Sequence, residues 1–157
     1  IIPGRTGTFG ETEGMKIQRM TEAVTDEVAK LEQQVFSRPW SRQGFLDTLA
    51  MDNVIFLTAM DGERLAGYCG VYLSIDEGEI TNVAVAPEYR RRGIARQLVQ
   101  ELIRQAQEVG ISRFLLEVRV SNEGAIALYR ELGFTDGGIR RNFYEFPRED
   151  ALVMIRQ

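Results

Sequence analysis

The sequence predicts an α/β protein, of the α+β type, in which a mixed central β-sheet is flanked by helices on both faces. Strand-like and helix-like stretches follow one another in the order β-α-α-β-β-β-α-β-α-β-β. No internal repeat, linker or low-complexity segment interrupts this series, and 157 residues are enough to bury a sizeable core. We therefore expect a single domain.

The predicted domain begins at Met15. The segment before it, residues 1–14, contains four glycines and no hydrophobic periodicity, so we interpret it as a disordered leader or as residues left over from expression. Residues 15–157 then form the domain. Its predicted helices lie at residues 21–35, 41–49, 94–109 and 122–132. Its predicted strands lie at residues 16–20, 54–60, 65–74, 79–86 and 113–120, with two more after residue 134 separated by a loop around Pro147.

The predicted helices have start and stop signals. Thr21, Ser41 and Ser121 are expected to cap three of them, because a hydroxyl oxygen can accept a hydrogen bond from an unpaired N–H of the first turn. Gly110 and Gly133 are expected to end two of them. A turn at Asp61-Gly62 joins two of the strands in a predicted hairpin.

The composition excludes several kinds of site. With 44% hydrophobic and 27% charged residues the chain is typical of a soluble globular protein, and no apolar run approaches the roughly 18 residues of a membrane span. Cys69 is the only cysteine, which excludes an internal disulfide and fits a reducing cytoplasm. Histidine is absent, which excludes Ser–His and Cys–His mechanisms and most zinc sites. We expect no metal and no membrane association, and acid–base chemistry must fall to carboxylates, tyrosines or lysines.

The stretch PEYRRRGIARQL at 87–98 is the most informative part of the chain. It is a basic, glycine-containing turn between a strand-like run and a helix, so unpaired N–H groups and the positive end of the helix dipole form an anion site there. A diphosphate fits such a site, to which four arginines add charge: Arg90, Arg91, Arg92 and Arg96. A solvated basic helix start is the plainer alternative. A nucleic-acid patch is disfavoured, because the net charge is −4 and the basic residues form no stripe.

The same stretch matches the pattern R/Q-x-x-G-x-G/A through Arg90, Gly93 and Ala95. It resembles the pyrophosphate loop of the GCN5-related N-acetyltransferases (GNAT), whose cofactor is acetyl-coenzyme A. The segments LLEVRVSNEGAIALYRELGF (115–134) and GIRRNFYEFPREDALVM (138–154) resemble one branch of that superfamily. That branch acetylates the N-terminal alanine of the eighteenth protein of the bacterial small ribosomal subunit. The resemblance covers nearly all of 15–157 and implies the GNAT fold.

Two side chains are also placed by helix geometry alone. Asn122 and Tyr129 share one face of the predicted helix, about 10 Å apart along its axis. That span suits a pantetheine arm, with Asn122 near its amides and Tyr129 near the sulfur; a core aromatic is the plainer interpretation of Tyr129.

Glu117 lies within an apolar strand, where a carboxylate is costly unless it is paired or reached by water. An ion pair with a neighbouring arginine is its plainer interpretation.

The resemblance assigns roles to these residues and to the cofactor contacts. It implies that Glu117 is the general base and that Tyr129 is the acid that protonates the leaving thiolate. It also implies that Asn122 meets the pantetheine or acyl region and that Ala95, where many relatives have glycine, must keep a negative φ. The implied pantetheine contacts are the backbone groups of Val83, Ala84 and Val85. The implied pyrophosphate contacts are Arg91, Arg92, Gly93, Ile94, Ala95 and Arg96.

These implications predict an N-alpha-acetyltransferase that acts by direct transfer on a ribosomal-protein N-terminus. The alternatives are a GNAT enzyme that acts on lysine side chains or small amines, and a non-catalytic acyl-CoA-binding module. We expect a cytoplasmic monomer with no nucleic-acid partner. Residues 140–144 either wall the acceptor site or form a plain exposed hairpin.

Overall fold

The computed structural model describes residues 15–157, so the predicted leader at 1–14 lies outside the described residues. The predicted order of elements is confirmed within this range. The helices are α1 (Thr25–Val35), α2 (Arg42–Leu49), α3 (Ile94–Glu108) and α4 (Glu123–Glu131), with short 3₁₀ turns at Glu22–Val24 and Pro87–Tyr89. The strands are β1 (Met15–Arg19), β2 (Val54–Asp61), β3 (Arg64–Ser74), β4 (Glu77–Val85), β5 (Arg113–Arg119), β6 (Thr135–Tyr144) and β7 (Glu149–Arg156).

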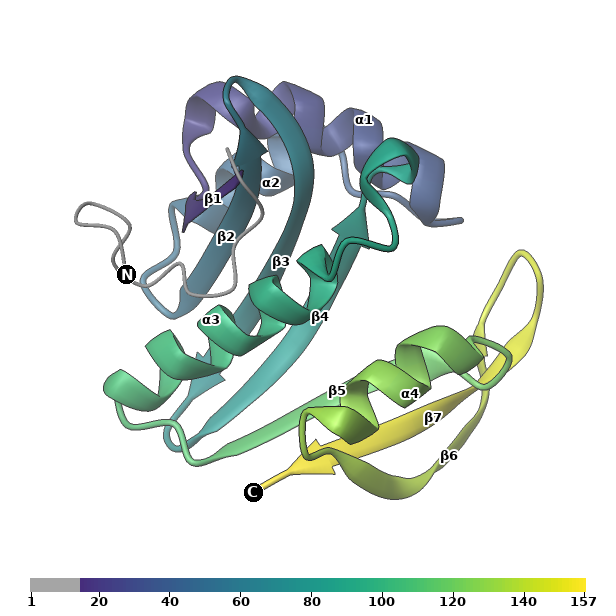
Figure 1. Ribbon diagram of the computed structural model, residues 1–157. Coiled ribbons are helices and arrows are strands. Elements are labelled where there is room, and N and C mark those ends of the chain that lie inside the picture. The colour runs from purple at the N-terminus through teal and green to yellow at the C-terminus, as the bar shows by residue number, and fades with distance from the viewer. Residues whose placement is uncertain (1–14) are drawn as a thin grey trace.

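The strands form one mixed sheet in the order β1-β2-β3-β4-β5-β7-β6. All neighbouring pairs are antiparallel except β4 and β5, which run parallel because α3 crosses over between them. Figure 1 shows α1 and α2 against one face of the sheet and α3 and α4 against the other. The predicted fold class, a mixed sheet with helices on both faces, is therefore confirmed.

The sheet is forked between β4 and β5. The two strands pair only at their starts, from Glu77 opposite Arg113 to Glu79 opposite Leu115, and then separate (Figure 1). Just beyond the last pair, β4 carries a bulge, since Gly70 of β3 lies opposite Asn82 and Val71 opposite Ile80. Bulges of this kind are common beside active sites, where they redirect a strand. The fork leaves one edge of β4 without a neighbouring strand.

A continuous apolar core holds both halves of the sheet to the helices. On α3, residues at helical spacing are buried against β2, β3 and β4, among them Leu98, Leu102 and Ala106. In β5, buried Phe114, Leu116 and Val118 alternate with Leu115, Glu117 and Arg119, as the sequence predicts. This alternation sends Glu117 and Arg119 to the same face of the sheet.

Two of the predicted helix caps are wrong. Ser41 does cap α2, since its Oγ accepts a hydrogen bond from the Gly44 N–H at 3.1 Å. Thr21 instead precedes a 3₁₀ turn and makes no side-chain cap. At α4 the cap is Asn122 in place of Ser121, since the Asn122 Oδ1 accepts a hydrogen bond from the Ala125 N–H at 3.2 Å and the helix starts one residue later than predicted, at Glu123. No helix within 15–157 is long and apolar enough to cross a membrane.

Candidate functional site

Two cavities flank the fork. The smaller, of about 350 Å³, lies at the N-terminus of α3 and is bounded on its other side by α4. The larger, of about 540 Å³, lies between the separated strands and is bounded by α4, the α1–α2 connection and the end of β6. The larger one brings together Glu117, Asn122 and Tyr129, three residues that the sequence analysis singled out.

The smaller cavity has the backbone of an anion site. Gly93, the residue before α3, has φ +75°, and a Cβ built on it would meet no atom within 4 Å. The first helical bond runs from Gln97 N–H to Gly93 C=O at 3.1 Å, so the N–H groups of Ile94, Ala95 and Arg96 have no partner within the helix. Ala95 lies inside the helix and therefore keeps the negative φ expected of it. The open space and the aligned N–H groups suit a phosphate group.

The arginine side chains around this cavity differ in their orientation. Arg91 lines it and has a φ of +65°. Arg96 also lines it, where it forms an ion pair with Glu131 of α4. Arg92 does not contribute to the lining; its guanidinium lies over the ring of Tyr89, 5.0 Å from the centroid. An anion in this cavity would thus compete with Glu131 for Arg96.

The free edge of β4 presents backbone groups to the fork. The Ala86 N–H donates toward β3, and because successive backbone groups alternate between the two edges of a strand, Ala84 also faces β3. Val83 and Val85 then face the fork. The Val85 carbonyl accepts a hydrogen bond from Arg90 Nε at 3.2 Å, which leaves the N–H and C=O of Val83 directed at the larger cavity. An extended ligand could pair with this edge as an added strand would.

Tyr129 extends from α4 into the larger cavity. Its ring is only 7% exposed and packs edge-on against Phe134, with the centroids 5.7 Å apart. Burial raises the pKa of the Tyr129 hydroxyl, and nearby Cys69 and Tyr144 raise it further. The hydroxyl therefore stays protonated around neutral pH and can act as a proton donor. The ring also packs as a core aromatic would. A role in packing and a role as proton donor therefore differ only in whether the hydroxyl is used.

Glu117 is on the opposite side of the larger cavity, on β5. Its side chain is 12% exposed and its Oε2 forms an ion pair with Arg140 of β6, which leaves Oε1 without a hydrogen bond to any described residue. The ion pair expected as the plainer interpretation is therefore present. Glu79, which the sequence analysis missed, faces the same cavity from β4. Burial raises the pKa of Glu79, the charge of Glu117 raises it further, and Arg140 opposes that rise.

Asn122 has two functions at the end of the larger cavity. Its Oδ1 caps α4 by accepting a hydrogen bond from the Ala125 N–H at 3.2 Å. No bond to its Nδ2 occurs within residues 15–157, so this amide group can still donate to a ligand in the cavity that it lines.

A buried carboxylate at the base of the larger cavity was not predicted. Glu32 of α1 is 2% exposed and accepts hydrogen bonds from Tyr68 Oη, from Asn82 Nδ2 at 3.3 Å and from Trp40 N–H at 3.1 Å. Burial raises the pKa of Glu32, and these hydrogen bonds oppose the rise. Asn82 Oδ1 is buried without a hydrogen-bond partner among the described residues. A signal existed in the sequence, since Glu32 lies four residues after Val28 on the apolar face of its helix.

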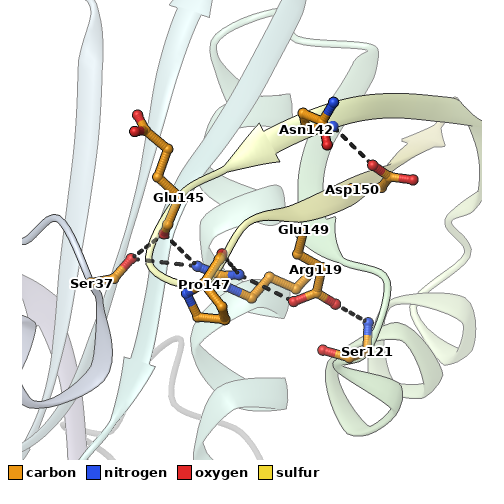
Figure 2. Close-up of polar contacts among 8 residues, drawn as sticks. All are labelled: Ser37, Arg119, Ser121, Asn142, Glu145, Pro147, Glu149 and Asp150. Carbon is orange, nitrogen blue, oxygen red and sulfur yellow. Dashed lines mark hydrogen bonds and ion pairs between the residues drawn. The ribbon is translucent and has the colours of Figure 1, made fainter.

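The remaining wall of the larger cavity comes from two distant loops. Residues 36–41, which connect α1 and α2, lie beside residues 145–148, which connect β6 and β7 (Figure 2). Of the predicted acceptor-wall stretch 140–144, Phe143 and Tyr144 line this cavity, and Arg140 reaches it through Glu117. Within the part of the chain that the structure describes, no group of three or more acidic or cysteine side chains could hold a metal ion.

Comparisons with known proteins agree on one family. The model of the acetyltransferase (GNAT) family matches residues 25–134. The ribosomal protein bS18-alanine N-acetyltransferase of Escherichia coli (strain K12) is 37% identical over 126 residues, which cover 79% of this chain and 84% of that protein.

The solved structures give the same result for the fold. The crystal structure of the ribosomal-protein-S18-alanine N-acetyltransferase from E. coli matches with a TM-score of 0.83 and 32% identity, over 90% of this chain and 92% of that one. Arabidopsis thaliana NAA60 in complex with acetyl-CoA matches with a TM-score of 0.82 over 90% of this chain and 97% of that one, and at 16% identity it supports the fold alone.

Proposed function

The chain belongs to the acetyltransferase (GNAT) family and is an acyltransferase, and we propose that it uses acetyl-CoA to acetylate the N-terminal alanine of ribosomal protein bS18. The observation that carries the proposal is the likeness to the E. coli bS18-alanine N-acetyltransferase, at 37% identity over 79% of this chain. Glu117 and Tyr129 line the same cavity, and this supports the proposal because an acetyl transfer to an amine needs a proton acceptor and a proton donor at one site.

The two cavities and the β4 edge fit acetyl-CoA. Gly93 leaves open space beside unpaired N–H groups for the pyrophosphate, and the Val83 backbone is free to bind the pantetheine amides. Asn122 Nδ2 would donate to the same arm. Acetyl-CoA supplies the acetyl group as a thioester, and its sulfur leaves as a thiol. The arm would run from the smaller cavity to the larger one and end near Tyr129.

The protein's own residues would move two protons in this reaction. A peptide α-amine has a pKa of about 7.7–8.0 and is largely protonated at neutral pH, so it must lose a proton before it can attack. Glu117 Oε1 would accept that proton, directly or through a water, while Arg140 holds Oε2 and fixes the carboxylate. Tyr129 Oη would donate a proton to the leaving sulfur, since its raised pKa keeps it protonated.

The acceptor would enter from the face that carries α1 and α2. Glu117 and Arg119 point to that face, and the two loops 36–41 and 145–148 wall the larger cavity there. All of these groups come from one chain, so the proposal needs only a monomer. A ribosomal substrate supports a cytoplasmic location. Lysine side chains or small amines as acceptors, or cofactor binding without turnover, are the competing functions.

One kinetic comparison separates these functions. Thiol release is followed with a hexapeptide that has the N-terminal sequence of bS18, with an N-terminally blocked lysine peptide, and with a small polyamine. The proposal predicts turnover on the first peptide, at a kcat/KM at least a hundredfold above the other two. Preference for the lysine peptide or the polyamine would reassign the acceptor. Tight CoA binding without thiol release on any acceptor would identify a binding module.

A further inference from the structure

Two loops that are about a hundred residues apart in the sequence are tied together across the fork. Ser37 Oγ, in the 36–41 connection, donates to the Glu145 carbonyl of the 145–148 loop at 3.1 Å. Arg38 Nη2 donates to Glu145 Oε1 at 2.9 Å, and the Arg38 guanidinium lies over the Phe146 ring at 5.3 Å. The Arg38–Glu145 pair is more than half exposed on both sides, so it alone contributes little to holding the loops.

Arg119 of β5 lies at the centre of this contact, as Figure 2 shows. Its side chain is 24% exposed, and its guanidinium lies 4.4 Å from the centroid of the Tyr144 ring. Its two terminal nitrogens bond both loops and the start of β7. The acceptors are the Pro147 carbonyl at 2.9 Å, Glu149 Oε1 at 3.1 Å, the Glu145 carbonyl at 3.2 Å and Ser37 Oγ at 3.4 Å.

This geometry requires an arginine. Four acceptors on two loops and one strand are reached by one planar group with several donors in fixed directions, and the same plane stacks on an aromatic ring. A lysine would keep the charge near Glu149 and would lose most of the other bonds. Two of the acceptors are loop carbonyls, so Arg119 fixes the path of the backbone at 145–147.

The position of Arg119 connects the loops to the proposed chemistry. It is two residues beyond Glu117 on the same face of β5, and both line the larger cavity. Neither the loops nor Arg119 line the smaller cavity at the N-terminus of α3. A substitution at Arg119 should therefore weaken binding of the acceptor in the larger cavity and leave binding of the pyrophosphate in the smaller cavity unchanged.

We propose that Arg119 is a positioning residue for the acceptor: it holds the 145–148 loop against the 36–41 connection and so fixes the wall along which the acceptor N-terminus approaches Glu117. The inference rests on the proposed function, because it assigns an acceptor to the larger cavity. The inference adds to that function a residue that acts on the acceptor through two loops, without contact with the reacting atoms.

The kinetic test compares three variants with acetyl-CoA and the bS18 N-terminal hexapeptide. Arg119→Ala should lower kcat/KM for the peptide roughly tenfold to a hundredfold, mostly through a higher KM, since small displacements of a positioned substrate have effects of this size. The KM for acetyl-CoA should stay within about twofold. Arg119→Lys should restore part of the loss. Arg130→Ala is the matched control, because it removes an exposed arginine paired with Asp136 outside both cavities, and it should behave as wild type.

A double-variant cycle tests whether Arg119 acts on the acceptor through the 145–148 loop. Ser37→Ala should weaken the same loop contact, because Ser37 Oγ donates to the Glu145 carbonyl and accepts a hydrogen bond from Arg119. Its effect on the peptide KM should therefore be less than additive with that of Arg119→Ala. Additive effects would contradict the proposal. Equal losses for the peptide and acetyl-CoA, or no loss for the peptide, would also overturn it. If the alanine variant does not fold, the lysine variant carries the same comparison.

Hydrogen exchange tests the loop contact without relying on activity. In Arg119→Ala, the amides of residues 143–148 and 36–41 should exchange faster while those of α3 are unchanged, and in Arg130→Ala neither set should change. If the wild-type enzyme fails to acetylate the peptide, the proposed function fails, and unchanged exchange at 143–148 would separately refute the role of Arg119.

Discussion

Replacing Tyr129 with phenylalanine removes one oxygen atom from the proposed reaction centre and leaves the packing of the ring. The ring is 7% exposed and contacts Phe134 edge-on with centroids 5.7 Å apart, an arrangement that phenylalanine can keep. No hydrogen bond to the Tyr129 hydroxyl occurs within residues 15–157, so no buried partner is left unpaired. We expect the free energy of unfolding to change by less than about 0.5 kcal/mol.

The rate should change far more than the stability. Loss of a positioned general acid slows a reaction by about 10²- to 10⁴-fold, which corresponds to roughly 2.7–5.5 kcal/mol of activation free energy. Affinity for acetyl-CoA should change little, because the proton is donated only as the sulfur leaves. Since burial raises the pKa of Tyr129, the wild-type rate should show no decline from ionisation of this tyrosine between neutral and moderately alkaline pH.

The assay is single-turnover acetylation of the bS18 hexapeptide, which isolates the chemical step, together with urea unfolding of each variant. Tyr68→Phe is the matched comparison, because it removes the same atom from a hydroxyl that donates to buried Glu32. That variant should lose about 1–3 kcal/mol of stability. A Tyr129→Phe enzyme with near-native single-turnover rate would show that Tyr129 is a packing residue and would refute its role as the acid.

Three further predictions concern the base, the cofactor site and the buried carboxylate. Glu117→Gln should lower the rate, and the defect should shrink as pH rises through about 8 and more of the α-amine is neutral; a defect independent of pH would contradict proton acceptance. Gly93→Val should weaken CoA binding at least tenfold, or about 1.4 kcal/mol, as measured by calorimetry. The branched side chain would fill the open space proposed for the pyrophosphate and would be strained at the φ of +75°. Unchanged affinity in a folded variant would contradict the pyrophosphate assignment. Burial raises the pKa of Glu32 above about 4.5, so the folded state binds the Glu32 proton more tightly than the unfolded state does. As pH rises above 4.5, the free energy of unfolding of the wild type should therefore fall relative to that of Glu32→Gln, by up to about 1.4 kcal/mol per pH unit. Urea unfolding from pH 4 to 8 measures this difference, and a difference that does not change with pH would refute the prediction.

Most elements of the fold were predictable because the periodicity of their apolar residues is a local property of the sequence. The buried spacing on α3 and the alternation in β5 both follow from the sequence. The cap of α4 was not, because Ser121 and Asn122 are both good cap residues. Only the position at which the backbone enters the helix distinguishes them: α4 begins at Glu123, and the Ala125 N–H donates to Asn122 Oδ1.

The parts of the site that were missed depend on long-range pairing. Periodicity predicted β4 and β5 as strands, yet it carries no information on how far they pair, so the fork could not be foreseen. The hydrogen-bond partners of Glu32 come from other elements, and those of Arg119 come from two loops and the start of β7. By contrast, Glu117, Asn122 and Tyr129 lie in one continuous segment, 115–134, whose resemblance to the acetyltransferase branch implied their roles, and all three line the larger cavity.

The proposed acceptor is tested most directly on whole bS18. Purified, unacetylated bS18 is incubated with the enzyme and acetyl-CoA, and the product is examined by intact mass and by peptide fragmentation. We predict one added acetyl group, located on the α-amine of the N-terminal alanine and formed much more slowly when Glu117→Gln replaces the wild-type enzyme at neutral pH. Acetyl groups on lysine side chains, or an unchanged mass beside an active E. coli enzyme in the same assay, would contradict the proposed function.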